Sequence, residues 1–206
     1  MPETNPTTLY HSTTMKNLLK YSALLLASAF LFQACKDKDD DDTVAPPANE
    51  EELITTLRLT FAEADNAANT YELVFRDLDG EGGNAPVITV DTLPVELAFN
   101  VSVEVLNESL SPAEDISAEI QAEDEAHQFF FLVSGANLSL TYADADGNGL
   151  PVGLVNTAVS DAASAGTLLV TLRHEPNKTG AGVAAGDITN AGGETDLEVS
   201  FPVVIQ

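Results

Sequence analysis

From residue 53 onward, hydrophobic and polar positions alternate along most of the chain. The longest stripe runs from Val95 to Val105, with an apolar side chain at every second position. Similar stripes cover 53–61, 71–75, 129–133, 138–142, 168–172 and 197–205. Alternation is typical of strands that bury one face, and short turn segments separate the stripes. The pattern therefore predicts an all-β domain, an Ig-like or Greek-key β-sandwich of about nine strands.

One short helix is expected near 112–123. Ser111, Pro112 and Glu114 have the form of a capping box with proline at the first helical position. Ile116 and Ile120 then fall on one face of the helix.

Two segments resemble each other at a distance of about 70 residues. Residues 71–82 read YELVFRDLDGEG, and residues 138–149 read LSLTYADADGNG. The pair is consistent with a duplicated four-strand unit. Chance similarity between two β-hairpins is the alternative, and the sequence leaves both open.

The N-terminal part has the pattern of an export signal. Lys16 and Lys20 form a short basic region, and 18–32 is a mostly apolar run, shorter than the roughly 20 apolar residues of a membrane-spanning helix. Residues 15–34 are therefore predicted to be a signal peptide that begins at Met15. Residues 1–14 are then an upstream start artefact.

The one cysteine stands at the predicted cleavage point, after Phe32, Gln33 and Ala34. This arrangement resembles the relaxed lipobox of lipoproteins from the Bacteroidota. The resemblance implies that Cys35 becomes the first mature residue and carries a lipid that anchors the protein to the outer membrane.

Residues 35–52 are expected to form a solvated tether. They begin with CKDKDDDD, whose like charges repel one another, and Pro46 and Pro47 follow. An acidic run directly after a lipidated cysteine resembles the surface-export signal of Bacteroidota lipoproteins. It favours a location on the cell surface, with the periplasmic face of the outer membrane as the alternative. The β-sandwich domain is then expected to cover 53–206.

A wider resemblance covers most of the mature chain. It is carried by NEEELITTLRLTF, LNES, SPAEDISAEI, EAHQFFF, GTLLVTLRHEPNK and GDITNAGGETDLEVSFPV. These segments resemble a family of uncharacterised flavobacterial lipoproteins labelled "type 1 periplasmic binding fold superfamily protein". That label implies alternating helices and strands, whereas this chain is predicted to form strands and one short helix.

Charge and cysteine content exclude several functions. The chain has 33 Asp and Glu against 8 Lys and Arg, a formal net charge of −25. Few cations are therefore available to bind nucleic-acid phosphates or anionic lipid headgroups. A single cysteine excludes an internal disulfide and a cysteine-based metal cluster.

Two acidic loops are candidates for Ca²⁺ binding. Oxygen-bearing side chains alternate there before a glycine, as in the first half of an EF-hand loop. The candidate ligands are Asp77, Asp79 and Glu81 in one loop and Asp144, Asp146 and Asn148 in the other. Ordinary hairpin turns, which also favour Asp, Asn and Gly, are the alternative.

The two histidines of the predicted domain suggest a different metal site. His127 follows Glu125, and His174 precedes Glu175. Two imidazoles with nearby carboxylates would suit Zn²⁺ or another transition metal. Hydrogen-bonded structural histidines are the alternative.

No catalytic motif stands out: the chain has no Gly-x-Ser-x-Gly elbow, phosphate loop or dinucleotide fingerprint, so an enzyme is not expected. Thr43 and Thr92 lie in short stretches that resemble the O-glycosylation sequon of exported Bacteroidota proteins. The leading hypothesis is a lipid-anchored surface module that binds an extracellular ligand. The alternatives are a metal- or cofactor-capturing accessory of a TonB-dependent outer-membrane transporter and an adhesive protein stapled by Ca²⁺.

Overall fold

The computed structural model describes residues 53–80 and 82–206. The predicted start artefact, signal peptide and tether all lie outside this range. So do the predicted lipidation site Cys35, the sequon residue Thr43 and the candidate ligand Glu81.

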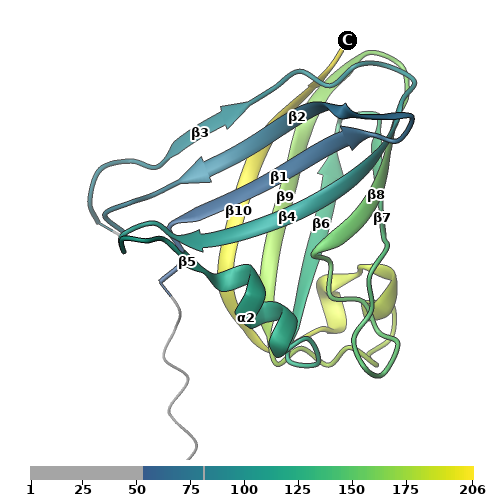
Figure 1. Ribbon diagram of the computed structural model, residues 1–206. Helices are drawn as coiled ribbons and strands as arrows, with labels where there is room; N and C mark the ends of the chain where they lie inside the picture. Colours follow the sequence, from purple (N-terminus) through teal and green to yellow (C-terminus); the bar gives the residue numbers. More distant parts are fainter. Residues whose placement is uncertain (1–52, 81) are drawn as a thin grey trace, which may run out of the picture. The chain divides into compact units, whose positions relative to one another are not determined.

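The described chain is an all-β sandwich, as the alternating stripes predict (Figure 1). The larger sheet consists, in spatial order, of β3 (Val87–Val90), β2 (Asn66–Arg76), β1 (Thr56–Glu63), β4 (Ala98–Asn107), β8 (Val155–Ser160) and β7 (Leu138–Tyr142), and the two-residue β5 (Glu114–Asp115) pairs with β4. The smaller sheet consists of β10 (Glu194–Ile205), β9 (Ser164–His174) and β6 (His127–Ser134). All of these strand pairs are antiparallel.

The core lies between the two sheets and contains the apolar stripes. Phe61 of β1 and Phe99 of β4 are fully buried, with rings in an edge-to-face contact at 5.8 Å. Leu168, Val170 and Leu172 of β9 face them from the smaller sheet, together with Phe129 of β6 and the apolar positions of β10. Both sheets therefore bury one face and expose the other, which is the physical basis of the period of two.

The predicted helix is present but shorter than expected. The helix α2 covers Ile116–Ala122 and buries Ile116 and Ile120 against the core. Its N-cap is Asp115, whose carboxylate accepts a hydrogen bond from the N–H of Ala118. The capping box is not used, because Glu114 and Asp115 pair with β4 instead.

The two halves of the chain distribute their strands differently. In the predicted repeat, β2, β3, β4 and β6 would correspond to β7, β8, β9 and β10, yet β4 belongs to the larger sheet and β9 to the smaller one. The topology therefore does not repeat in the way that a simple duplication would produce.

The connection from β9 to β10 contains two short 3₁₀ turns, η1 (Val183–Ala185) and η2 (Ile188–Asn190). It folds over the outer face of the smaller sheet, where Val183 and Ala191 bury Phe130. Figure 1 shows these turns and α2 at the same end of the sandwich.

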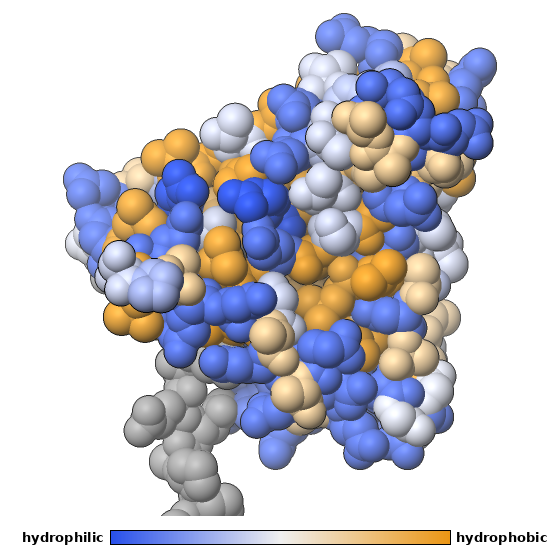
Figure 2. Space-filling model, viewed as in Figure 1, coloured by the Kyte–Doolittle hydropathy of each residue, from blue (hydrophilic) through white to orange (hydrophobic). Residues whose placement is uncertain are grey.

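Seen from the side of the larger sheet, the surface is mostly hydrophilic, with apolar patches between the polar residues (Figure 2). Among the described residues, no helix has the length and apolar character needed to cross a bilayer.

Candidate metal centre

The smaller sheet brings the two histidines together. His127 is the first residue of β6 and His174 the last of β9, and antiparallel register places them directly opposite each other. Their rings stack with centroids 4.8 Å apart and planes 8° from parallel. His127 continues the inward-facing row of Phe129, and His174 continues the row of Leu172. The pair therefore lies on the core side of the sheet, at its end.

A third candidate ligand comes from β10. The pairing of β10 with β9 shifts register between Thr195 and Leu197, which leaves Asp196 as the extra residue of a β-bulge. One ligand atom of each of His127, His174 and Asp196 lies within 4.8 Å of the others. Among the His, Cys, Asp and Glu residues of the described part of the chain, these three form the group whose side chains could hold one metal ion together.

His127 is held as a neutral ring with a defined tautomer. It is only 5% exposed, and its Nδ1 lies 3.1 Å from the carbonyl oxygen of Glu123. Because a carbonyl can only accept, Nδ1 must carry the proton, which leaves the lone pair on Nε2. Burial lowers the pKa of His127 below its usual 6.5, and nearby His174 lowers it further; the Glu123 carbonyl and Asp196 oppose this shift. Metal-binding histidines commonly have this arrangement.

The turn that supplies the Glu123 carbonyl is itself anchored. The ammonium of Lys178 donates hydrogen bonds to the carbonyl of Asp124 and, at 2.9 Å, to Oδ2 of Asp146. The side chains of Lys178 and Asp146 are 4% and 1% exposed, so this ion pair is buried. The N–H of Glu175 also donates to Ala126 at 2.6 Å. These contacts fix the backbone that orients His127.

The three ligands match the chemistry of a transition-metal site. Two imidazole nitrogens and one carboxylate form a three-ligand set of the kind that leaves a fourth position for water or another group. A tetrahedral ion with bonds near 2.1 Å needs ligand atoms about 3.4 Å apart. The ligand atoms, which lie within 4.8 Å of one another, would have to approach by up to about 1.4 Å to surround an ion.

The carboxylates that the sequence paired with the histidines lie elsewhere. Glu125 and Glu175 are exposed, and neither belongs to the cluster of three. Asp196 takes the place that was predicted for them. Its position depends on the bulge in β10, which the alternating pattern of residues 194–205 does not reveal.

The second acidic loop uses its carboxylates to hold the loop itself. Asp144 accepts hydrogen bonds from the N–H groups of Gly153 and Val155, both at 2.8 Å. Oδ1 of Asp146 accepts from the N–H groups of Asn148 and Leu150, both at 2.9 Å, while Oδ2 binds the Lys178 ammonium. The positive charge beside Asp146 is thus supplied by a lysine of the same chain.

The first acidic loop has similar internal bonds. Asp77 accepts from the N–H of Gly80 at 3.1 Å. Asp79 accepts from the backbone and side-chain N–H groups of Asn84, and these bonds lower the pKa of its carboxyl. Aspartates that form turns typically accept hydrogen bonds from the N–H groups of their own loop. Thr92, the sequon residue in the described range, is exposed in the connection between β3 and β4.

Comparison of the chain with known protein families, with curated proteins and with solved structures returns no match.

Proposed function

We propose that this protein captures a divalent transition-metal ion, of the class that includes Zn²⁺, at His127, His174 and Asp196. The observation that carries the proposal is the convergence of these three side chains from three strands to within 4.8 Å. The hydrogen bond from Nδ1 of His127 to the Glu123 carbonyl supports it, because it leaves Nε2 as the ring nitrogen that can bind an ion.

The ligand set favours a transition metal over Ca²⁺. Imidazole nitrogen suits Zn²⁺, Cu²⁺, Ni²⁺ and iron, whereas Ca²⁺ requires six to eight oxygens. With three protein ligands, one position stays available for exchange. An exchangeable position suits a protein that takes up an ion and passes it on better than it suits a closed structural staple.

The proposed setting comes from the sequence. A lipid on Cys35 and an acidic tether over 35–52 would hold the domain at the outer membrane, on the cell surface. There the domain would act as a metal-capturing accessory of an uptake transporter. An excess of acidic residues, 33 against 8 basic ones, would attract cations to such a module.

Thermal unfolding of the metal-stripped protein tests the proposal. An ion that binds the folded state raises stability by RT ln(1 + [L]/Kd), or about 2.7 kcal/mol at one hundred times Kd. For a domain of this size, that corresponds to a midpoint rise of roughly 5–10 °C. We expect Zn²⁺ to produce this rise, and His174→Ala and Asp196→Asn to abolish it.

Glu175→Gln is the matched control, because it removes an exposed carboxylate beside His174 that lies outside the cluster. We expect this variant to keep the full response to Zn²⁺. A rise that persists in Asp196→Asn, or an equal rise with Ca²⁺ that is lost in Asp144→Ala, would contradict the proposed site. The second outcome would instead support the alternative of a Ca²⁺-stapled surface protein.

A further inference from the structure

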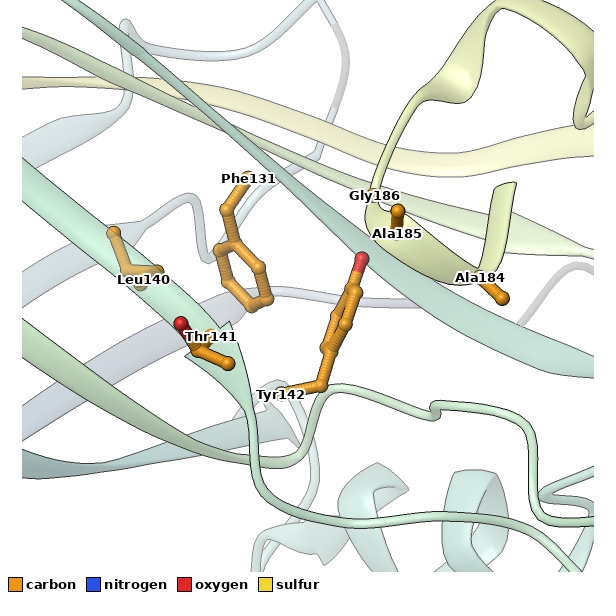
Figure 3. Close-up of a pocket in the computed structure, with 7 residues that line it drawn as sticks. All are labelled: Phe131, Leu140, Thr141, Tyr142, Ala184, Ala185 and Gly186. Atoms are coloured by element: carbon orange, nitrogen blue, oxygen red, sulfur yellow. The ribbon is translucent and has the colours of Figure 1, made fainter. Parts of the chain in front are cut away.

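The two sheets end beside the same opening. In the part of the chain that the structure describes, β6 is an edge strand of the smaller sheet and β7 is an edge strand of the larger one. A hollow of about 410 Å³ lies between them. Figure 3 shows the rings of Phe131 and Tyr142 beside Leu140 in this hollow, with Ala184 to Gly186 along one side.

The smaller sheet has fewer strands than the sheet it covers. Three strands face the six that form the main path of the larger sheet. As a result, Phe131, Leu140 and Tyr142 are only partly buried although they point toward the core side. The hollow lies where a fourth strand of the smaller sheet would run.

The edge of β6 presents hydrogen-bonding groups to this opening. The N–H of Phe129 donates to the carbonyl of Val152 at 2.7 Å, and its carbonyl accepts from the Tyr142 hydroxyl at 2.6 Å. Both backbone groups of Phe129 therefore point away from β9. Strands have a period of two, so the backbone groups of Phe131 and Val133 point the same way. No backbone hydrogen bond from another described residue reaches them at this edge.

The strand β7, on the other side of the hollow, also has a free edge. The N–H of Ala143 donates to Val155 of β8 at 2.9 Å, so the alternate residues Leu140 and Tyr142 direct their backbone groups away from β8. Unpaired strand edges bind extended polypeptides by adding a strand, and pockets for alternate side chains provide the specificity.

Two occupants are conceivable for this edge, a second copy of this chain and a different protein, and charge favours the second. Residues 53–206 contain four Lys and Arg against 24 Asp and Glu, so a second copy of this chain would be repelled. A basic partner would be attracted.

We propose that the β6 edge and its hollow accept an extended segment of a partner protein with alternating apolar and basic residues. Its backbone pairs with Phe131 and Val133, and its apolar side chains enter the hollow beside Leu140 and Tyr142. This surface is separate from the proposed metal centre, so either proposal can fail without the other.

The test uses the synthetic peptide Lys-Val-Lys-Val-Lys-Val-Lys and residue-resolved amide hydrogen exchange. We expect this peptide to slow exchange of the Phe131 and Val133 amides at least tenfold. Two control peptides separate the causes: Lys-Lys-Val-Val-Val-Lys-Lys has the same composition without alternation, and Glu-Val-Glu-Val-Glu-Val-Glu has the opposite charge. Neither control should protect these amides.

Val133→Pro removes the N–H at the free edge, a position where proline is tolerated in edge strands. Phe131→Ala removes a wall of the hollow without changing the backbone. Both variants should lose protection by the peptide, and Val133→Thr should retain it. Absence of protection in the wild-type protein overturns the proposal. So does protection that depends on protein concentration without peptide, because it would indicate a second copy as the occupant.

Discussion

His127 is a titratable side chain whose surroundings favour its neutral form. Burial lowers its pKa, and the hydrogen bond to the Glu123 carbonyl fixes the proton on Nδ1. In the unfolded chain, the same histidine takes up a proton near its ordinary pKa of 6.5. Acid therefore favours the unfolded state, and it also opposes metal binding because a protonated imidazole has no lone pair for an ion.

The metal-free protein should accordingly lose stability as pH falls below 6.5. In that range the unfolded state binds more protons than the folded state, so the free energy of unfolding decreases with decreasing pH. Urea unfolding at pH 7.5 and at about pH 5.5 measures the effect. His127→Phe keeps a ring at this buried position without a titrating group and should reduce the pH dependence. An unchanged dependence in this variant would show that other groups cause it.

The strand ends determine the geometry of the site. The strands β9 and β10 supply His174 and Asp196, and the connection between them returns through Gly192 and Gly193. Both glycines have positive φ, but their surroundings differ. A Cβ on Gly193 would lie 2.3 Å from the carbonyl oxygen of His174, whereas a Cβ on Gly192 would meet nothing within 4 Å.

This pair of glycines provides a matched test. Gly192→Ala should cost about 1–2 kcal/mol, the strain of a left-handed residue, and leave Zn²⁺ binding unchanged. Gly193→Ala should cost more, because it must also displace the backbone of His174. It should weaken Zn²⁺ binding by roughly tenfold or more, as changes in the support of metal ligands do. Denaturant unfolding and a Zn²⁺ titration of both variants measure the difference. Equal effects would show that the His174 backbone does not position the site.

The strands could be predicted where one face is apolar, as in β1, β4 and β10, because burial of one face imposes alternation. The strand β8 has the opposite pattern: Asn156 and Ser160 are buried, and Val159 is 51% exposed. The buried hydroxyl of Ser160 donates to the carbonyl of Pro94, which lies in a connection distant in the sequence. Such partners depend on the tertiary fold, so no local pattern could indicate this strand.

The candidate site could be predicted only in part. The sequence predicts the two histidines as a pair, and strand register does bring them together. Proximity in the sequence indicates Glu125 and Glu175 as partners of the histidines, yet both are exposed and lie outside the cluster. Strict alternation would place Asp196 on the outer face with Glu194 and Glu198. The bulge changes its direction, and bulges leave no clear signal in the sequence.

At the scale of the whole molecule, acidic charge complicates any study of metal binding. A net charge of −25 attracts cations of every kind to the surface. This attraction is screened over about 10 Å at 0.1 M salt, whereas coordination by three converging side chains is not. Binding at the proposed centre must therefore be distinguished from general accumulation by observing the ligand atoms themselves, at physiological salt.

The most direct measurement is nitrogen-detected NMR of the histidine rings during titration of the metal-stripped protein with Zn²⁺. The proposed metal centre predicts a saturating change at one ion per chain in the ring nitrogens of His127 and His174. Nδ1 of His127 should remain protonated while Nε2 binds the ion, and Asp196→Asn should abolish the response. Histidine signals that stay unchanged while Zn²⁺ binds elsewhere, or an ion bound at Nδ1 of His127, would contradict this account.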